Sequence, residues 1–283
     1  MSRHPSLLRI AVTAVLSAVL AACAALPPSR APAVESRISE IKSLARLSDV
    51  LAEAPDTRTL VVFDIDDTLL TSSTFFGSDY WYEWQKSLAP GEAGKALCLF
   101  DVIGANYELG TQRPTEPDAV RVFNGLNRDV LLLTARSPMY RGGTERELLA
   151  AGYVLPPMRG KPGHGEYFEQ PAGTAISYQH GILMVSGQDK GALLTTWLNR
   201  RGLHYRRVIL VDDGRRNIEN VQRSLQSAGI NYHGLWYTRI DKPEPVPETL
   251  RRQGVEGWQR LEALMRTMFP ERLARWQSGQ CGY

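Results

Sequence analysis

The stretch LVVFDIDDTLL, residues 60–70, decides how this chain of 283 residues is organised. Four apolar residues lead directly into a segment with three aspartates and a threonine. A continuous apolar run of this kind predicts a strand that is buried on both faces, as in a parallel sheet. The strand would then carry carboxylates to the edge of the sheet, where acids are costly unless a cation neutralises them. The alternative is that the acids only form a polar loop after the strand.

Segments with strand and helix patterns alternate through the rest of the chain. Two more apolar runs end in polar residues, Asp129–Thr134 and Arg207–Asp213, and a further strand is predicted near Leu235–Tyr237. Helical patterns lie before and between the strands, over residues 36–54, 115–126 with Thr115 as the cap, 143–151, 187–198 and 217–228. This alternation predicts an α/β fold, a Rossmann-like parallel sheet flanked by helices.

Two insertions interrupt this alternation, at about residues 71–115 and 140–187, and both are predicted to be cap segments over the strand ends. The first is rich in aromatic residues, which either close over a substrate or fasten the insertion to the core. The second contains a predicted hairpin over residues 175–185. The core would therefore span residues 37–245, and a helical extension, residues 246–283, would lie outside it.

The N-terminus has the pattern of an exported protein. Basic residues precede an apolar run that is too short to span a bilayer, so residues 1–22 are predicted to be a signal peptide. The run ends in Leu-Ala-Ala-Cys23, which resembles the bacterial lipobox, and a Pro- and Ala-rich tether, residues 23–36, follows. We expect lipidated Cys23 to anchor the chain to a membrane on the periplasmic side. The resemblance to the lipobox also implies outer-membrane sorting, because Ala24 rather than an aspartate follows the cysteine. The alternative is an ordinary cleaved secretory signal.

Composition bears on partners and on cysteine chemistry. Residues 1–22 contain two of the 33 basic residues, Arg3 and Arg9, so the mature chain keeps 31 basic against 30 acidic residues. A nearly neutral chain gives no electrostatic case for binding nucleic acid. Cys98 and Cys281 would be able to pair in an oxidising compartment, although the sequence does not place them within bonding distance. The oligomeric state stays open.

The polar residues that end the predicted strands are the candidates for chemistry. In an open α/β sheet, ligands bind outside the carboxyl ends of the strands. Residues that are far apart in the sequence would therefore converge there, together with a lysine that opens a helix. These candidates are Asp64, Asp66, Thr134, Ala135, Lys190, Asp212 and Asp213.

The order Asp-x-Asp-x-Thr, strand-ending Thr, Lys and strand-ending Asp-Asp is similar to the four motifs of the haloacid dehalogenase superfamily. The resemblance extends from about residue 60 to 236. The run Phe63–Ser73 also resembles the first motif of the class B periplasmic acid phosphatases, and the lipid anchor is similar to that of the lipoprotein acid phosphatases. The segment Asp212–Asn217 departs from the Gly-Asp-x-Asp form of the class B enzymes, which leaves the closer subfamily and any nucleotide preference open.

The resemblance implies a phosphatase that hydrolyses a small phosphorylated molecule through an aspartyl-phosphate. Asp64 would attack phosphorus, and Asp66, on the same side of the strand, would protonate the leaving group and then activate water. Thr134 and backbone N–H groups near Ala135 would hold phosphate oxygens, and Lys190 would neutralise charge that develops in the transition state.

The resemblance also implies Mg²⁺ as the cofactor. The expected ligands are Asp64, the backbone carbonyl of Asp66, and either Asp212 or Asp213. Asn217 is a further candidate in the outer shell of the ion. Which of the two adjacent aspartates binds the metal directly stays open.

Other readings of the same residues are available. Taken singly, Thr134 would serve as a turn cap, Lys190 as a solvated helix start, and Asp212 and Asp213 as loop caps. A phosphotransferase would share the aspartyl-phosphate step but would need a second acceptor. A non-catalytic envelope lipoprotein would keep the same fold as a binding module.

Overall fold

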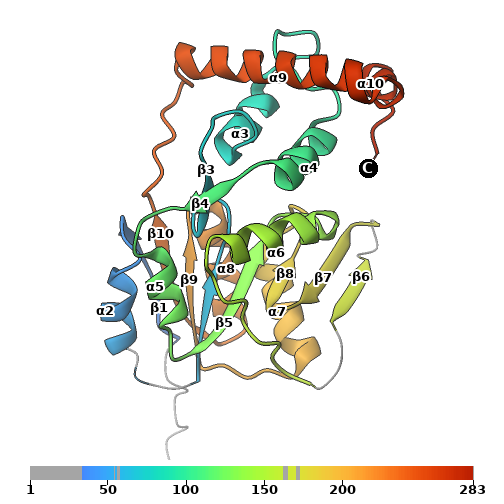
Figure 1. The fold of residues 1–283 in the computed structure, drawn as a ribbon. Helices are drawn as coiled ribbons and strands as arrows, with labels where there is room; N and C mark the ends of the chain where they lie inside the picture. Colours follow the sequence, from blue (N-terminus) through green and yellow to red (C-terminus); the bar gives the residue numbers. More distant parts are fainter. Residues whose placement is uncertain (1–33, 54, 56–57, 162–164, 170–172, 283) are drawn as a thin grey trace, which may run out of the picture. The chain divides into compact units, whose positions relative to one another are not determined.

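An eight-stranded sheet forms the centre of the described part of the chain (Figure 1). The computed structural model describes residues 34–53, 55, 58–161, 165–169 and 173–282. The strands, in their order across the sheet, are β1 (Ser36–Ile41), β10 (Asn231–Tyr237), β9 (Arg207–Asp212), β2 (Thr59–Phe63), β5 (Asp129–Thr134), β8 (Ile182–Met184), β7 (Ala175–Gln179) and β6 (Glu166–Glu169). The first six are parallel, and β7 and β6 pair antiparallel at one edge. The predicted α/β fold, a mostly parallel sheet flanked by helices, is confirmed.

Helices cover both faces of the sheet because alternate residues of a strand point to opposite sides. On one face, Val61 and Phe63 of β2 belong to a core with residues of α2 (Arg46–Ala52), α5 (Ala119–Asn124) and α6 (Arg141–Ala150). On the other face, Leu60 and Val62 pack with residues of α7 (Lys190–Arg201) and α8 (Arg215–Ser227). Every residue of β2 is buried, as its unbroken apolar sequence predicts.

Two predicted helices differ from the structure at their starts. The single helix predicted over residues 36–54 is wrong, because residues 36–41 form β1, and only α2 is helical. The edge of β10 offers β1 six parallel pairings, which outweigh the helical spacing of Ile38 and Ile41. The helix predicted to be capped by Thr115 begins only at Ala119, and the Thr115 hydroxyl donates to the Thr68 carbonyl at 2.8 Å instead.

The second predicted insertion, residues 140–187, is largely built into the core. It supplies α6 and the strands β6, β7 and β8, which extend the main sheet. The hairpin expected over residues 175–185 is present as β7 and β8, which turn at His180 and Gly181. The short 3-10 helix η1 (Pro138–Tyr140) leads from β5 into α6.

The first insertion and the C-terminal tail form one cap above the strand ends (Figure 1). A short antiparallel pair, β3 (Leu70–Ser72) and β4 (Gln112–Pro114), connects α3 (Asp79–Ser87) and α4 (Leu99–Leu109) to the core. The tail forms α9 (Glu248–Met268) and α10 (Pro270–Gln277). Trp81 and Trp84 of α3 are buried with Met265 and Trp276 of the tail, so these aromatic side chains fasten the cap together. The tail is helical, as the sequence predicts, but it shares a core with the first insertion.

Two glycines of α9 let it approach the aromatic residues of the first insertion closely. A Cβ atom at Gly254 would lie 2.6 Å from the Trp84 ring, and one at Gly257 would lie 2.4 Å from the Phe76 ring. Such distances are too short for real side chains, so any larger residue at either position would force α9 away from the first insertion.

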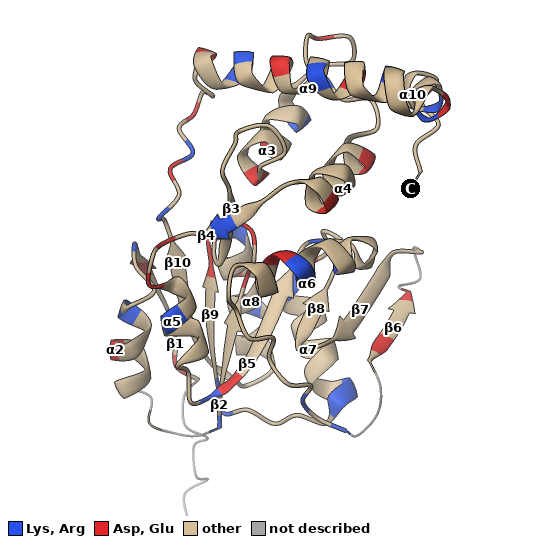
Figure 2. Ribbon diagram, in the orientation of Figure 1, with Lys and Arg blue, Asp and Glu red and all other residues tan. Residues whose placement is uncertain are grey.

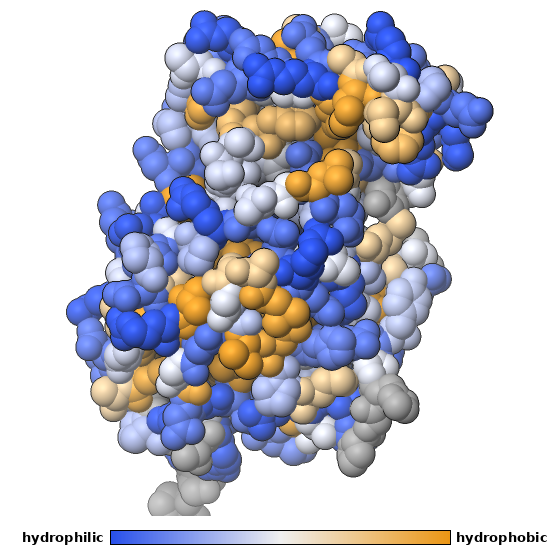
Figure 3. Space-filling model, in the orientation of Figure 1, coloured by the Kyte–Doolittle hydropathy of each residue, from blue (hydrophilic) through white to orange (hydrophobic). Residues whose placement is uncertain are grey.

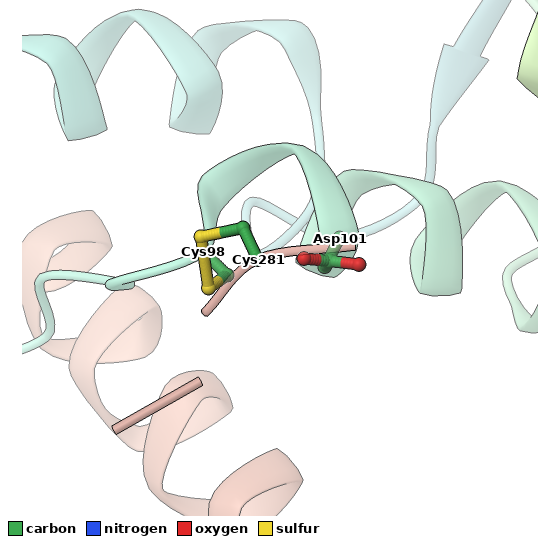
Figure 4. Close-up of side chains that lie close together, drawn as sticks. All are labelled: Cys98, Asp101 and Cys281. Carbon is green, nitrogen blue, oxygen red and sulfur yellow. A yellow bond between two sulfur atoms is a disulfide. The ribbon is translucent and has the colours of Figure 1, made fainter. Parts of the chain in front are cut away.

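A disulfide between Cys98 and Cys281 closes the cap (Figure 4). The two cysteines are 183 residues apart in the sequence. Beside them, the Asp101 carboxylate accepts hydrogen bonds from the Gly282 backbone at 2.7 Å and from Arg272 at 2.9 Å. The tail is therefore joined covalently and by polar contacts to the start of α4.

Charged and apolar side chains both occur on the surface of the described residues. Acidic and basic residues alternate along α9, where Arg251, Arg260 and Arg266 pair with glutamates of the same helix (Figure 2). Apolar side chains reach the surface over α5 and α6 and again near the junction of α9 and α10 (Figure 3). Within the described residues, no helix has the length and apolar character needed to cross a bilayer. The predicted signal peptide, lipidated Cys23 and nearly all of the tether lie outside the described residues.

Candidate active site

The structure brings together three of the predicted site residues at the carboxyl ends of β2 and β9. These strands are neighbours, and Asp64 follows β2 directly while Asp212 ends β9. Lys190, the first residue of α7, places its Nζ 2.7 Å from Asp64 Oδ1 and 2.7 Å from Asp212 Oδ2. All three side chains are at least 93% buried, since their exposed fractions are 2% for Lys190, 7% for Asp64 and 0% for Asp212. The convergence predicted for these residues is therefore present.

Burial and neighbouring charges act in opposite directions on this group. Burial alone would lower the pKa of Lys190, but Asp212 and Asp64 outweigh it, and the pKa lies above its ordinary value. Burial raises the pKa of Asp64 well above its usual range, and the nearby Asp212 and Asp213 raise it further against the opposing effect of Lys190. The lysine is thus a firmly charged cation that faces more negative charge than it can balance.

The adjacent residues Asp212 and Asp213 point to different partners. Asp212 Oδ1 accepts hydrogen bonds from the Gly214 backbone at 2.8 Å and from Asn217 Nδ2 at 3.0 Å. Asp213 Oδ2 instead lies 2.8 Å from the Nζ of Lys242. Burial raises the pKa of Asp213 to about 7, although Lys242 opposes the shift. Asn217, which the sequence predicts in the outer shell of the ion, holds Asp212 in its orientation through the hydrogen bond to Oδ1.

The Asp66 carboxylate is paired with an arginine that the sequence prediction missed. Arg136 donates from Nε to Asp66 Oδ2 at 2.9 Å and from Nη2 to Oδ1 at 2.7 Å. The guanidinium is buried, also donates to Thr144 Oγ1, and lies 3.9 Å from the centre of the Tyr107 ring. Asp66 is thus fixed by a two-pronged ion pair, the strongest geometry that an arginine offers a carboxylate.

The two predicted phosphate-binding residues lie at the end of β5, next to β2. Thr134 is fully buried, and its Oγ1 accepts a hydrogen bond from the Arg136 backbone at 3.1 Å. Ala135 is exposed, and its carbonyl accepts from the Gly187 backbone at 2.8 Å. This contact ties the loop after β5 to the loop that precedes α7.

A cavity of about 300 Å³ opens beside Asp66, between the strand ends and the cap. The core contributes Ala135 and Arg136 to its wall, and residues of α3 and its N-terminal turn form another part. Most of the remaining lining is aromatic or aliphatic: Tyr82, Phe100, Ile103, Tyr107, Met139 and Tyr140. The tryptophans of the aromatic insertion therefore pack inside the cap, and other rings of the insertion line the cavity.

Three further charged residues join the site without having been predicted. Arg136 follows Thr134 by two residues, so its position at a strand end was a usable signal. Lys242 and Asp79 carried no comparable signal, because they come from a loop after the last strand and from the cap. The carboxylates of the cluster outnumber its cations two to one: Asp64, Asp66, Asp67, Asp79, Asp212 and Asp213 against Arg136, Lys190 and Lys242.

The donor set at the strand ends fits a magnesium ion. One carboxylate oxygen from each of Asp64, Asp212 and Asp213 lies within 4.8 Å of the others. Carboxylate oxygens are the ligands that Mg²⁺ prefers, and the excess of negative charge around Lys190 favours an added cation. Both adjacent aspartates belong to this group. The Asp66 carboxylate is held by Arg136, which leaves its backbone carbonyl as the atom available for the predicted role.

Comparisons with known proteins give a family but no activity. The sequence profile of a family described as "Protein of unknown function (DUF2608)" matches residues 39–270, and the chain belongs to that family. No curated protein sequence matches the chain. Among solved structures, it is similar to the Legionella pneumophila effector Ceg4, with 16% identity over 75% of this chain and 94% of that one. The TM-score is 0.34, so this likeness supports no conclusion about fold or function.

Proposed function

We propose that this member of the DUF2608 family is a Mg²⁺-dependent phosphomonoester hydrolase of the haloacid dehalogenase type, which works through an aspartyl-phosphate on Asp64. The observation that carries the proposal is the meeting of Asp64, Lys190 and Asp212 at neighbouring strand ends. The order of these residues in the sequence, which resembles the motifs of that superfamily, supports the same assignment. The aromatic cavity beside Asp66 supplies room for the leaving group of the ester.

In the first half of the reaction, an oxygen of the Asp64 carboxylate attacks phosphorus, and the bond from phosphorus to the ester oxygen breaks. For Asp66 to protonate the departing alkoxide, its carboxyl group would have to leave Arg136 and take up a proton before the ester bond breaks. Lys190 stands 2.7 Å from Asp64, so its ammonium stabilises the negative charge on the transferring group. Arg136 holds Asp66 at the cavity wall, where the leaving oxygen would lie.

In the second half, a water molecule attacks phosphorus, and Asp66 takes one of its protons. The bond from phosphorus to the Asp64 oxygen breaks, which releases inorganic phosphate and restores the free carboxylate. The backbone N–H group of Ala135, next to Thr134, would hold a phosphate oxygen, whereas the N–H groups of Arg136 and Gly187 already donate to Thr134 and Ala135 within the protein. Every proton and electron pair is thus returned to its starting residue.

A Mg²⁺ ion held by Asp64, Asp212 and Asp213 would supply the positive charge that keeps Asp64 ionised and lets a phosphate dianion approach three carboxylates. The fit of these donors to the ion supports this part of the proposal. Asn217 and the Gly214 backbone would hold Asp212 in its orientation toward the ion.

We also propose an envelope location with a lipid anchor at Cys23. The disulfide between Cys98 and Cys281 supports an oxidising compartment, because such bonds are rare in the cytosol. The substrate would then be a small phosphorylated molecule that reaches the periplasmic side of the membrane.

The test is the release of phosphate from p-nitrophenyl phosphate by the full chain, with Mg²⁺ and with EDTA. We expect Asp64→Asn to lower the rate by roughly 10³-fold or more, since no other group replaces the nucleophile. The matched control is Asp118→Asn, which changes an exposed aspartate that pairs only with Arg121 at the surface. Acid-quenched wild-type protein should carry a phosphoryl group on the peptide that contains Asp64.

A rate that persists in EDTA, or one that Asp64→Asn leaves unchanged, contradicts the hydrolase proposal. Transfer of phosphate to an added alcohol in place of water identifies a phosphotransferase. Absence of turnover on a broad panel of phosphate esters, with intact folding, identifies a binding protein.

A further inference from the structure

A second lysine holds a separate group of acids at the boundary of core and cap. Lys242 lies in the segment between β10 and α9. Its Nζ is 2.7 Å from Asp67 Oδ2, 2.7 Å from Asp79 Oδ2 and 2.8 Å from Asp213 Oδ2. Three carboxylates from three different segments therefore meet at one ammonium group.

Two of these acids belong to the rigid edge of the core. Asp67 follows β2, has a φ angle of +52°, and its Oδ1 accepts a hydrogen bond from Thr71 at 2.6 Å. Asp213 follows β9, and its backbone N–H donates to Thr68 Oγ1 at 3.1 Å. Both positions are thus fixed by contacts that involve neither α3 nor the C-terminal tail.

The third acid, Asp79, is the first residue of cap helix α3. Burial raises the pKa of Asp79, with Lys242 opposing the shift. The ammonium group of Lys242 lies within 2.8 Å of all three carboxylates, so it offsets the repulsion between the start of α3 and the acids of the core.

The position of α3 decides the shape of the cavity on the side of the leaving group. Asp79 lines the cavity with Ser78 and Tyr82 from the same helix and its N-terminal cap, while Ala135 and Arg136 belong to the core. The phosphate end of the site is formed instead by Lys190 and the strand ends, which belong entirely to the core.

We propose that Lys242 is a positioning residue, which holds the start of α3 against the acidic edge of the core and so shapes the leaving-group side of the cavity. Its kinetic consequences rest on the proposed phosphatase function, whereas its effect on α3 does not. Because Lys242 acts on the leaving-group side, its loss should weaken binding of the whole ester more than binding of free phosphate.

The kinetic test compares Lys242→Met with the wild type in the full chain, at a Mg²⁺ concentration that saturates both proteins, since Lys242 also contacts Asp213. We expect the KM for p-nitrophenyl phosphate to rise about tenfold, while the inhibition constant of inorganic phosphate changes by less than about twofold. Lys42→Met serves as the control, because Lys42 is exposed and lies between β1 and α2. A general loss of folding would lower the maximal rate and leave both constants unchanged.

A second variant, Asp79→Ala, breaks the contact between Lys242 and the cap, shortens one side chain of the cavity wall, and leaves Lys242 with Asp67 and Asp213. It should reproduce the rise in KM, and it keeps the test usable where Lys242→Met folds poorly. Equal changes in KM and in the phosphate inhibition constant, or an unchanged KM in Asp79→Ala, would overturn the proposal.

Amide hydrogen exchange tests the positioning role of Lys242 whether or not the protein hydrolyses phosphate esters. We expect faster exchange in α3 in both variants, with no change in β2 and β9 and none in Lys42→Met. Unchanged exchange in α3 would refute the positioning role itself. Faster exchange in α3 in a protein that hydrolyses no ester would uphold this role and reject the proposed function.

Discussion

The core edge and the cap are built in opposite ways. The core edge takes its shape from short contiguous runs, such as the five buried residues of β2 and the strands on either side of it. The cap joins residues 79–109 to residues 248–277, and a disulfide that spans 183 residues closes it. The groups proposed to break the phosphate ester bond lie on the core edge, which local sequence determines. Much of the cavity wall that would contact the leaving group lies on the cap.

Charge is also handled differently in the two regions. Lys190 is 2% exposed and pairs with two aspartates of the core. Lys242 is 23% exposed, and one of its three partners belongs to the cap. The buried pair cannot be broken without leaving charges in a nonpolar environment, whereas solvent reaches part of the Lys242 cluster. We therefore expect damage at Lys190 to unfold the core and damage to the cap to stay local.

The largest expected effect follows from Lys190→Met. It leaves Asp64 and Asp212 buried without their cation, and such a loss costs about 3–5 kcal/mol of unfolding free energy. Urea unfolding in EDTA measures it, since no added cation then replaces the ammonium. Lys42→Met, at an exposed site, should change the free energy by less than about 0.5 kcal/mol. A similar small change in Lys190→Met would show that the core edge does not depend on this pair.

The next effect should be confined to the cap. Replacing both Cys98 and Cys281 by alanine removes the link between α4 and the tail, at a cost of about 2–4 kcal/mol to the part that it closes. Hydrogen exchange should become faster in α4, α9 and α10 and stay unchanged in β2 and β9. Wild-type protein treated with a reductant is the matched comparison. An equal increase in hydrogen exchange in β2 and β9 would show that the core edge and the cap unfold together, which would contradict the expectation that damage to the cap stays local.

This difference also explains which parts of the molecule the sequence predicts. The strands Asp129–Thr134 and Arg207–Asp212 have almost the predicted bounds, because uninterrupted apolar runs leave a buried strand few alternatives. Residues 36–41 were assigned to a helix, because their pairing partner β10 lies almost 200 residues away. Local spacing contains no information about such a partner.

The residues of the candidate site also differ in how far the sequence predicts them. Asp64, Lys190 and Asp212 were predictable because each stands at the end of a strand or the start of a helix whose place in an α/β sheet is known. Arg136 stands in the same kind of place and was recognisable in principle. Lys242 and Asp79 were not, since only the folded cap brings a loop after the last strand to the first turn of α3.

The smallest predicted effect is a decrease in the free energy of unfolding at acid pH, which originates in the core. His233 of β10 is 3% exposed, accepts a hydrogen bond from Arg37 at Nδ1, and lies 2.9 Å from Ser39 through Nε2. Burial, with Arg37 nearby, lowers its pKa from 6.5 to about 4. Between these values the unfolded chain binds a proton that the folded protein does not, so the free energy of unfolding falls as the pH is lowered from 6.5 toward 4.

We expect this one residue to account for about 2–3 kcal/mol of the difference in unfolding free energy between pH 7 and pH 4. His233→Gln keeps polar atoms for Arg37 and Ser39 but has no proton to bind, so its stability should fall less in acid than that of the wild type. Urea unfolding at both pH values measures the difference. Equal losses in the two proteins would show that other groups cause the acid sensitivity. A smaller loss in the variant, with faster exchange of β1 and β10 in acidified wild type, would place the weakness at the edge of the core that is made by long-range pairing.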